Sequence, residues 1–254
     1  MSTILELEQV SKRFGGLTAV QNLSFSVQAG CITSLIGGNG AGKTTVFNLI
    51  TGYLSPDSGQ IRFGGKRIDG QPPHKIARTG ISRGFQELRL FNRLTALDNV
   101  MAAVPQQKGE NILRAIFGGK ALHQEARATE THSLTILEHL ALSHQVDVLG
   151  EQLSYGQQKL LALGRLVAAQ GSFLLLDEPT SGLSPAMVTD FCDRMKALVA
   201  SGCTILLIEH NVEIVMQLSD QVIVLHQGGK IAEGTPEEVR RNKTVMHTYL
   251  GLST

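Results

Sequence analysis

The stretch that decides the fold is Gly37-Gly38-Asn39-Gly40-Ala41-Gly42-Lys43-Thr44-Thr45, which fits the pattern G-x-x-x-x-G-K-[ST] of a phosphate-binding loop. An apolar run at 31–36 precedes it as a predicted buried strand, and a helix is predicted after it. The glycines let several backbone N–H groups face one centre, and the helix N-terminus adds partial positive charge. Lys43 can then reach the β- and γ-phosphates of a nucleotide, and the Thr44 hydroxyl can bind Mg²⁺. The alternative is a glycine-rich turn before an ordinary helix.

Composition excludes some functions. Hydrophobic residues make up 42% of the 254-residue chain, which is ordinary for a globular protein with a sizeable core. The net charge is +1 and there is no Trp, so we expect no nucleic-acid partner. The N-terminus lacks the basic start and apolar centre of a signal peptide, and no apolar run approaches the ~20 residues that span a bilayer. We expect a cytoplasmic protein that reaches a membrane only through partners.

Strand-like and helix-like segments alternate along most of the chain. Strands are predicted at 4–10, 23–27, 31–36, 60–63, 81–85, 173–176, 204–208, 221–225 and 230–232. Helices are predicted at 44–51, 73–78, 160–169, 185–200, from His210 onward and after the capping box at 235–238. Ser184 is the predicted cap of the helix at 185–200, and residues 11–16 are predicted to form a polar turn. This alternation predicts an α/β fold with a mostly parallel sheet and ligands at the carboxyl ends of its strands.

Residues 87–160 differ from the rest because strand-like runs are absent there. Helices are predicted at 97–104 and 122–142 from the spacing of their apolar residues. We interpret 87–160 as an inserted helical subdomain, with 1–86 and 161–254 forming the core. An apolar patch at 112–117 either faces membrane subunits or packs inside this subdomain.

Two adjacent carboxylates, Asp177 and Glu178, directly follow the apolar strand at 173–176. At a strand end the chain is turning, so both side chains can face one site. Asp177 is placed to hold Mg²⁺ through water. Glu178 is placed to polarise an attacking water as a general base. The alternative is an Asp-Glu pair that caps a helix.

A further motif, Leu153-Ser154-Tyr155-Gly156-Gln157-Gln158, precedes the helix at 160–169 and on its own is an ordinary N-cap. Together with the phosphate-binding loop, the carboxylate pair and His210, it makes the chain resemble the ATP-binding subunits of ABC transporters over essentially its whole length. The resemblance implies the P-loop NTPase fold of ABC ATPases. That fold has a mostly parallel core sheet, an antiparallel β subdomain and the inserted helical subdomain. It also implies that Ser154, Gly156 and Gln157 bind the γ-phosphate of ATP held by the opposite subunit.

The resemblance also implies roles for single residues. Phe14, in the turn at 11–16, corresponds to the loop aromatic that stacks on adenine, the alternative being a core Phe. Gln86 corresponds to the glutamine that reaches Mg²⁺ and the attacking water. His210 corresponds to the histidine that contacts the γ-phosphate. The implied catalytic residues are Glu178, His210 and Gln86, the implied Mg²⁺ ligands are Thr44, Gln86 and Asp177, and the implied cofactors are ATP and Mg²⁺.

Two positions depart from the pattern of the family. Gly38 replaces a common proline, and Ser184 replaces a common aspartate. Glycine at position 38 adds backbone freedom without removing N–H groups. Serine at position 184 keeps a short polar cap but loses a charge.

The finer resemblance is to the ATP-binding subunits of branched-chain amino-acid importers. It rests on residues 13–20, 86–91, 105–130, 154–158 and 249–251. Urea or amide importers and lipopolysaccharide-export ATPases share much of this pattern and stay open as alternatives. The implied partners are a second ATPase subunit, two integral membrane permease subunits and, indirectly, a periplasmic substrate-binding protein, at the cytoplasmic face of the inner or plasma membrane. Rival functions from other classes are an ABC ATPase of DNA repair or translation and a small-molecule kinase.

Overall fold

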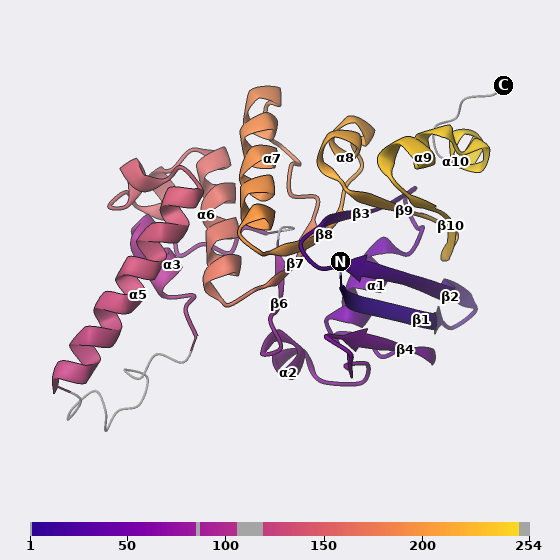
Figure 1. Cartoon of the computed structure of the whole chain (residues 1–254), viewed down its shortest axis with the longest axis horizontal. Helices are drawn as coiled ribbons and strands as arrows, with labels where there is room; N and C mark the ends of the chain where they lie inside the picture. The colour runs from indigo at the N-terminus through magenta and orange to yellow at the C-terminus, as the bar shows by residue number, and fades with distance from the viewer. Residues whose placement is uncertain (1, 85–86, 106–118, 249–254) are drawn as a thin grey trace.

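The computed structural model of the chain describes residues 2–84, 87–105 and 119–248. It consists of two sheets and the helices that pack around them (Figure 1). Three features of the sequence analysis lie outside the described residues: Gln86, the apolar patch at 112–117 and the segment 249–251.

The larger sheet has the strand order β10-β9-β3-β8-β7-β6. Its strands are β3 (Ile32–Gly37), β6 (Ile81–Gly84), β7 (Phe173–Asp177), β8 (Thr204–Ile208), β9 (Gln221–His226) and β10 (Gly229–Gly234). All neighbouring pairs are parallel except β10, which pairs antiparallel with β9. The predicted mostly parallel α/β sheet is therefore confirmed.

The central strands of this sheet, β3, β7 and β8, are buried on both faces. Leu174 and Leu176 of β7 belong to one hydrophobic cluster, and Phe173 and Leu175 belong to another. Successive strand residues point to opposite faces, so one short strand supplies both clusters. Burying a large aliphatic or aromatic side chain contributes about 1.5–3 kcal/mol, which explains why the run is uniformly apolar up to Asp177.

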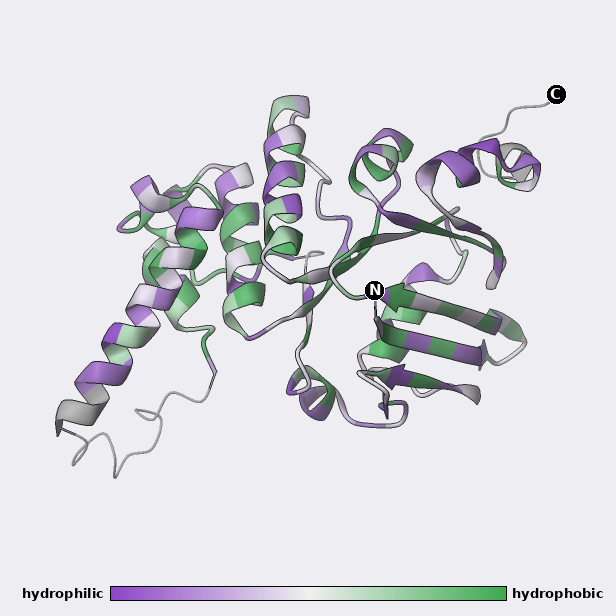
Figure 2. Cartoon of the chain, in the orientation of Figure 1, coloured by the Kyte–Doolittle hydropathy of each residue, from purple (hydrophilic) through white to green (hydrophobic). Residues whose placement is uncertain are grey.

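The smaller sheet is antiparallel, with the order β2-β1-β4-β5. Its strands are β1 (Thr3–Phe14), β2 (Leu17–Gln28), β4 (Ser58–Phe63) and β5 (Lys66–Arg67). Figure 2 shows apolar and polar residues alternating along β1 and β2, as expected for strands with one buried face. This sheet confirms the implied antiparallel part of the fold.

The first two strands are longer than predicted. The expected turn at 11–16 shrinks to its two glycines, and Phe14 is the last residue of β1 rather than a loop residue. The polar residues are accommodated because the β1–β2 register shifts several times. Gln9 and Asn22 take positive φ angles of 48° and 44°, as expected where a strand bulges.

The core helices are α1 (Lys43–Ile50), α2 (Pro73–Ala77), α7 (Pro185–Ala200), α8 (Val212–Leu218), α9 (Pro236–Arg241) and α10 (Lys243–Thr248). One helix start and one capping hydrogen bond differ from the predictions. His210 does not open α8, because the side chain of Asn211 accepts the N–H groups of Glu213 and Ile214 and caps the helix there. Ser184 precedes α7 as predicted, but its hydroxyl makes no capping hydrogen bond.

The helical region lies beside the larger sheet, on the left of Figure 1. It contains α3 (Ala96–Met101), α5 (Gly119–His139), α6 (Tyr155–Ala168) and two 3-10 turns, Ser143–Gln145 and Gly150–Gln152. Val100, Leu137 and Leu163 pack these helices into the same cluster as Leu174 and Leu176 of β7. Helix α6 continues without a break past residue 160, the predicted end of the helical subdomain. It therefore connects the segment that follows Ser154 directly to the core.

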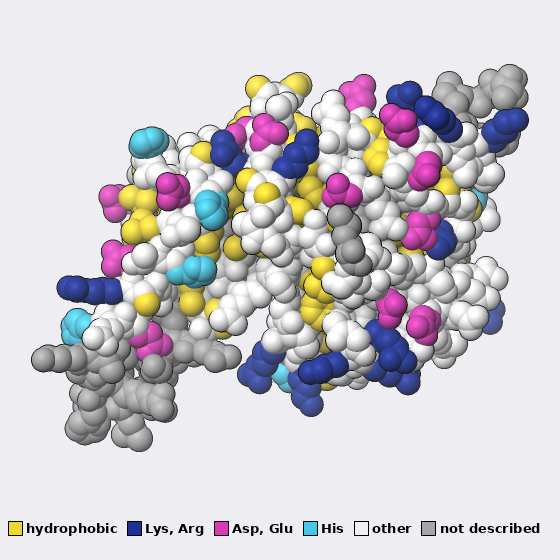
Figure 3. All heavy atoms as spheres, in the orientation of Figure 1, with side chains coloured by type: hydrophobic (Ala, Val, Ile, Leu, Met, Phe, Trp, Pro, Cys, Tyr) yellow, Lys and Arg dark blue, Asp and Glu magenta, His cyan; other side chains and the backbone are white. Residues whose placement is uncertain are grey.

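Charge is unevenly spread over the surface. Figure 3 shows Lys and Arg side chains gathered along the lower edge of the molecule, around α2 and β4. The exposed basic residues of this part of the chain are Lys66, Arg67, Lys75 and Arg78. The net charge of +1 therefore does not describe this edge.

Candidate functional site

The predicted phosphate-binding loop connects the buried end of β3 to α1. Gly42 is the N-cap of α1, with φ 98° and no side chain to make a capping hydrogen bond. A Cβ there would lie 2.4 Å from the carbonyl oxygen of Ala19 on β2, so only glycine fits. Gly38, Asn39 and Gly40 are exposed. The loop therefore presents exposed backbone and an uncapped helix start on one side.

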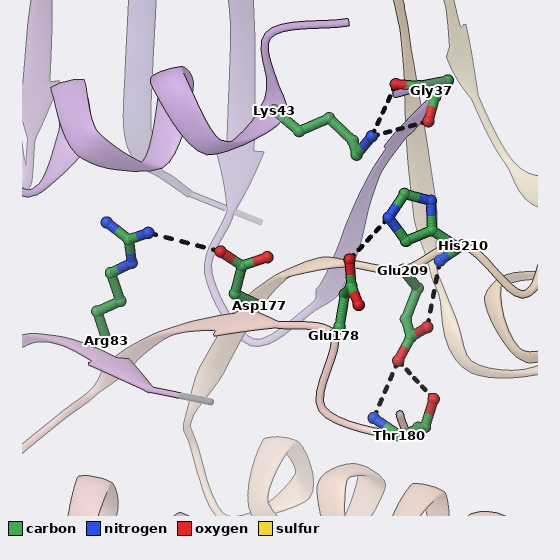
Figure 4. Close-up of polar contacts among 9 residues, drawn as sticks. Gly37, Lys43, Arg83, Asp177, Glu178, Thr180, Glu209 and His210 are labelled. Carbon is green, nitrogen blue, oxygen red and sulfur yellow. Dashed lines mark hydrogen bonds and ion pairs between the residues drawn. The ribbon is translucent and has the colours of Figure 1, made fainter. Parts of the chain in front are cut away.

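Lys43 begins α1, and its side chain turns back over the loop (Figure 4). Its Nζ donates to the carbonyl oxygens of Gly37 and Gly38, at 2.8 and 3.0 Å. Burial lowers the pKa of Lys43, while the charges of Glu178 and Asp177 oppose this shift. The ammonium group is thus held over the loop beside two carboxylates. Thr44 is exposed and Thr45 half-buried in the same first turn.

Asp177 ends β7 and is buried beside Arg83 of β6. The Arg83 Nη2 lies 3.5 Å from Asp177 Oδ2, and the Arg83 Nη1 donates to Asn48 Oδ1 of α1 at 2.5 Å. Burial raises the pKa of Asp177, and the Arg83 charge opposes this effect. Nothing in the sequence places Arg83 against Asp177, so the sequence predicted no role for it.

Glu178 follows Asp177, yet its side chain takes a different direction (Figure 4). Its Oε1 lies 2.8 Å from the Nε2 of His210, and both side chains are about half exposed. The backbone of Glu178 has φ 53°, which is unusual for a residue other than glycine and typical of functional sites. The structure therefore pairs two of the three predicted catalytic residues with each other. The third, Gln86, lies outside the described residues.

A buried polar cluster lies directly behind this pair. Glu209 Oε1 accepts from the N–H and the hydroxyl of Thr180, at 3.0 and 2.5 Å. Lys159 of α6 donates from Nζ to the carbonyls of Pro179 and Ser181, at 2.7 and 2.5 Å. No sequence motif predicted this cluster, although a Lys or Glu within an otherwise apolar run is a usable signal.

Ser154 caps α6, as predicted. Its hydroxyl accepts the N–H of Gln157 at 3.4 Å, and the Gln157 side chain accepts the N–H of Ser154 at 2.9 Å. A Cβ on Gly156 would meet the Met187 side chain of α7, so glycine allows close packing there. In Figure 1, α6 and α1 lie on opposite sides of α7. Ser154 and its helix therefore do not share the loop's site within one chain.

Phe14 stands at the tip of the β1–β2 hairpin. It is 46% exposed, which excludes the alternative of a core phenylalanine. The Lys12 Nζ lies 5.8 Å from the centroid of its ring. An exposed ring at a strand end keeps a face available for stacking.

Neighbouring strand ends thus gather a cation over an exposed loop, a buried carboxylate and a Glu–His pair. This set can bind a polyphosphate at the carboxyl ends of parallel strands and place a general base beside it. Among the residues that the structure describes, no helix is both long and apolar enough to cross a membrane.

Known proteins share this architecture. The ABC transporter family model matches residues 20–181, and a model described as branched-chain amino acid ATP-binding cassette transporter matches residues 230–251. The crystal structure of the ADP conformation of MJ1267, an ATP-binding cassette of an ABC transporter, superposes with a TM-score of 0.84. It is 34% identical, over 99% of this chain and 100% of that one.

Curated relatives agree in length as well as in sequence. The high-affinity branched-chain amino acid transport ATP-binding protein BraF of Pseudomonas aeruginosa is 40% identical over 253 residues, covering 98% of both chains. The corresponding protein LivG of Escherichia coli is 36% identical over 249 residues, again covering 98% of both. The chain therefore belongs to the ABC transporter family, as one of its ATP-binding and ATP-hydrolysing subunits.

Proposed function

We propose that this chain powers an ABC importer of branched-chain amino acids. The observation that carries the proposal is the match of residues 230–251 to a model specific for branched-chain amino-acid cassettes. The relatives named above, which match this chain over 98% of both lengths, are branched-chain amino-acid transport proteins, and this supports the proposal.

In the proposed mechanism, the loop at 37–45 and Lys43 bind the phosphates of ATP. Glu178 accepts the proton of the attacking water, a contribution of 10²–10⁴ in rate for a typical general base. His210, now paired with Glu178, turns to the γ-phosphate, so binding of ATP must break the 2.8 Å contact between them. Phe14 stacks on the adenine.

The residues also fit Mg²⁺, which prefers oxygen ligands and keeps several waters. Asp177 supplies a carboxylate at the strand end, where Arg83 opposes the rise of its pKa. Thr44 supplies an exposed hydroxyl, and Gln86 is the third proposed ligand. When bound, the ion neutralises charge on the β- and γ-phosphate oxygens.

The complete site needs a second ATPase subunit. Ser154, Gly156 and Gln157 stand away from the loop of their own chain and would contact ATP held by the partner. Two chains then enclose two ATP molecules, and closure acts through the helical subdomain at 87–160 on two permease subunits. The subunit lies at the cytoplasmic face of the membrane and serves a periplasmic binding protein indirectly.

Reconstitution tests the substrate. The chain is co-expressed with the genes that neighbour its own in the genome, and the complex that it forms with membrane proteins is placed in proteoliposomes. ATP-dependent uptake of leucine, isoleucine or valine is expected. Uptake of urea or an amide, or stimulation by lipopolysaccharide instead, would replace the proposed substrate class. Failure to copurify with any membrane protein would overturn the transport role and favour a rival ATPase class.

A further inference from the structure

A buried lysine on α6 holds the loop that follows Glu178. Lys159 is 3% exposed, and its Nζ donates to the carbonyl oxygens of Pro179 and Ser181. The residue between them, Thr180, is held by Glu209, which is 4% exposed. Two hydrogen bonds donated by Lys159 and two accepted by Glu209 thus hold one tripeptide.

This arrangement is costly for a merely structural purpose. Removing a charge from water carries a large penalty, and well-packed apolar residues often stabilise a core as well as a buried ion pair does. Lys159 is 3% exposed and stands in a run of buried residues with Leu160 and Leu161, so its charge is removed from water. Burial accordingly lowers the pKa of Lys159, and the charge of Glu209 opposes the shift.

The two charged residues come from two parts of the chain that, in the proposed mechanism, serve different ATP molecules. Lys159 lies five residues after Ser154, just over one helical turn along α6. Glu209 directly precedes His210 at the end of β8. The tripeptide between them starts one residue after Glu178, whose φ of 53° is rare for its residue type.

A second contact joins the same two parts. Tyr155 opens α6, and its ring lies against Gly182, where an added Cβ would come within 3.1 Å of it. The Lys159 Nζ lies 5.4 Å from the centroid of the Tyr155 ring. The start of α6 and the loop after β7 therefore form one packed unit.

We infer that Lys159 and Glu209 are positioning residues that fix the Ser154 helix to the Glu178–His210 end of the same chain. The start of α6, which serves the partner's ATP, would then be coupled to the loop that follows Glu178, which serves the chain's own ATP. This inference rests on the proposed two-site mechanism, and it predicts that loosening the contact impairs hydrolysis while leaving nucleotide binding by the single chain intact.

The test replaces Lys159 by methionine, which keeps the length of the side chain and removes the charge. The kcat for ATP hydrolysis is expected to fall at least tenfold, while the Kd of the isolated chain for ATP stays within twofold of the parent. Lys159→Arg keeps the charge and the donors, and is expected to recover most of the lost kcat. Leu198→Ala, in the buried face of α7, is the matched control for a general loss of stability.

Comparison at a temperature well below both melting transitions separates positioning from stability. If Leu198→Ala lowers Tm as much as Lys159→Met yet keeps kcat, the effect of Lys159 is specific. Equal losses of kcat in both variants would overturn the inference. So would a Lys159→Met protein with the kcat of the parent.

A double variant tests whether the two residues act together. If Lys159 and Glu209 form one device, adding Glu209→Gln to Lys159→Met lowers kcat by less than a further twofold. Independent roles would instead multiply the two separate losses, and that outcome contradicts the inference. A parent chain without ATPase activity would count against the proposed function itself, which is a different failure.

Discussion

Two helix N-termini carry most of the proposed phosphate-binding residues, and they are built differently. The first, at α1, begins behind Gly42 and has no side-chain cap. The second, at α6, begins behind Ser154 in a complete capping box with Gln157. A capping side chain satisfies N–H groups that an anion would otherwise bind. The start of α1 is therefore open to phosphate in a single chain, whereas at α6 the N–H groups of Ser154 and Gln157 already have side-chain partners.

The uncapped start of α1 and the capped start of α6 suit the order in which they would bind ATP, α1 first and α6 after the dimer forms. The start of α6 must stay folded in the single chain, before a partner's ATP is present, and its capping box stabilises it there. Its Ser154–Gln157 bond is 3.4 Å long, beyond the usual 2.7–3.2 Å range, so replacing it by a phosphate oxygen costs little. We therefore expect α1 to bind in the monomer and α6 only in the dimer.

The largest effect is expected from Glu178→Gln, which should stop the cycle with both helix starts bound to ATP. An amide cannot accept the proton of the attacking water, so kcat should fall by about 10²–10⁴. ATP should still bind and hold the dimer closed. Hydrogen exchange would then show added protection at residues 155 and 156 in this ATP-bound dimer, since the N–H groups of Gln157 and Gln158 are already hydrogen-bonded in the single chain. Turnover within twofold of the parent would remove Glu178 from its role.

Lys43→Ala should weaken phosphate binding at the start of α1 and leave the start of α6 unchanged. A hydrogen bond to a charged group contributes about 1.5–3 kcal/mol, so ATP affinity should fall on the order of 100-fold. Titration with a fluorescent ATP analogue measures this, with the exposed Lys75→Ala as the control. Unchanged affinity would show that the loop at 37–45 is not the phosphate site.

Ser154→Ala should break the second helix start alone. Because α6 serves the partner's nucleotide, the Kd of the isolated chain for ATP should stay within twofold, while kcat falls on the order of tenfold, the equivalent of about 1.4 kcal/mol. Loss of the cap should also lower the free energy of unfolding by about 1 kcal/mol. A weaker ATP affinity in the monomer would mean that the starts of α1 and α6 bind the same nucleotide, which contradicts separate roles for them.

The sequence predicted the elements where local chemistry and tertiary context agree. The strand ending at Asp177, the glycine-rich loop and the capping boxes at Ser154 and Thr235 all carry their signal within a few residues. Where the signal was local but incomplete, the predictions were wrong in detail. Phe14 continues a strand that bulges, and the helix after His210 starts at Val212 because Asn211 caps it.

The contacts that position the site could not be predicted because they join distant segments. Arg83 meets Asp177 across 94 residues, and Lys159 reaches Pro179 across 20. Their partners are set by the parallel pairing of β6 with β7 and by the packing of α6 on the loop after β7. A buried charge in an apolar run signals that some partner exists, but only the fold decides which one.

The smallest effect is expected at α9, which carries a second complete capping box and is the matched control for α6. Thr235→Ala removes the same kind of cap, since its hydroxyl accepts from the N–H of Glu238. Stability should drop about as much as for Ser154→Ala, but ATP binding and kcat should not change. A loss of kcat here would mean that any lost cap impairs hydrolysis, and the special role of Ser154 would fail.

The two boxes should also differ in their response to acid. Hydrogen bonds from the N–H and the hydroxyl of Thr235 lower the pKa of Glu238 below its ordinary value of 4.5. A lowered pKa means that this box stabilises the fold above about pH 4.5 and loses that stabilisation as the pH falls through the lowered value. Gln157 in the box of α6 does not titrate. Urea unfolding at neutral pH and near pH 4 measures this. The loss of unfolding free energy caused by Thr235→Ala should be smaller in acid, while the loss caused by Ser154→Ala should stay constant. Equal behaviour of the two variants would contradict the proposed difference between the boxes.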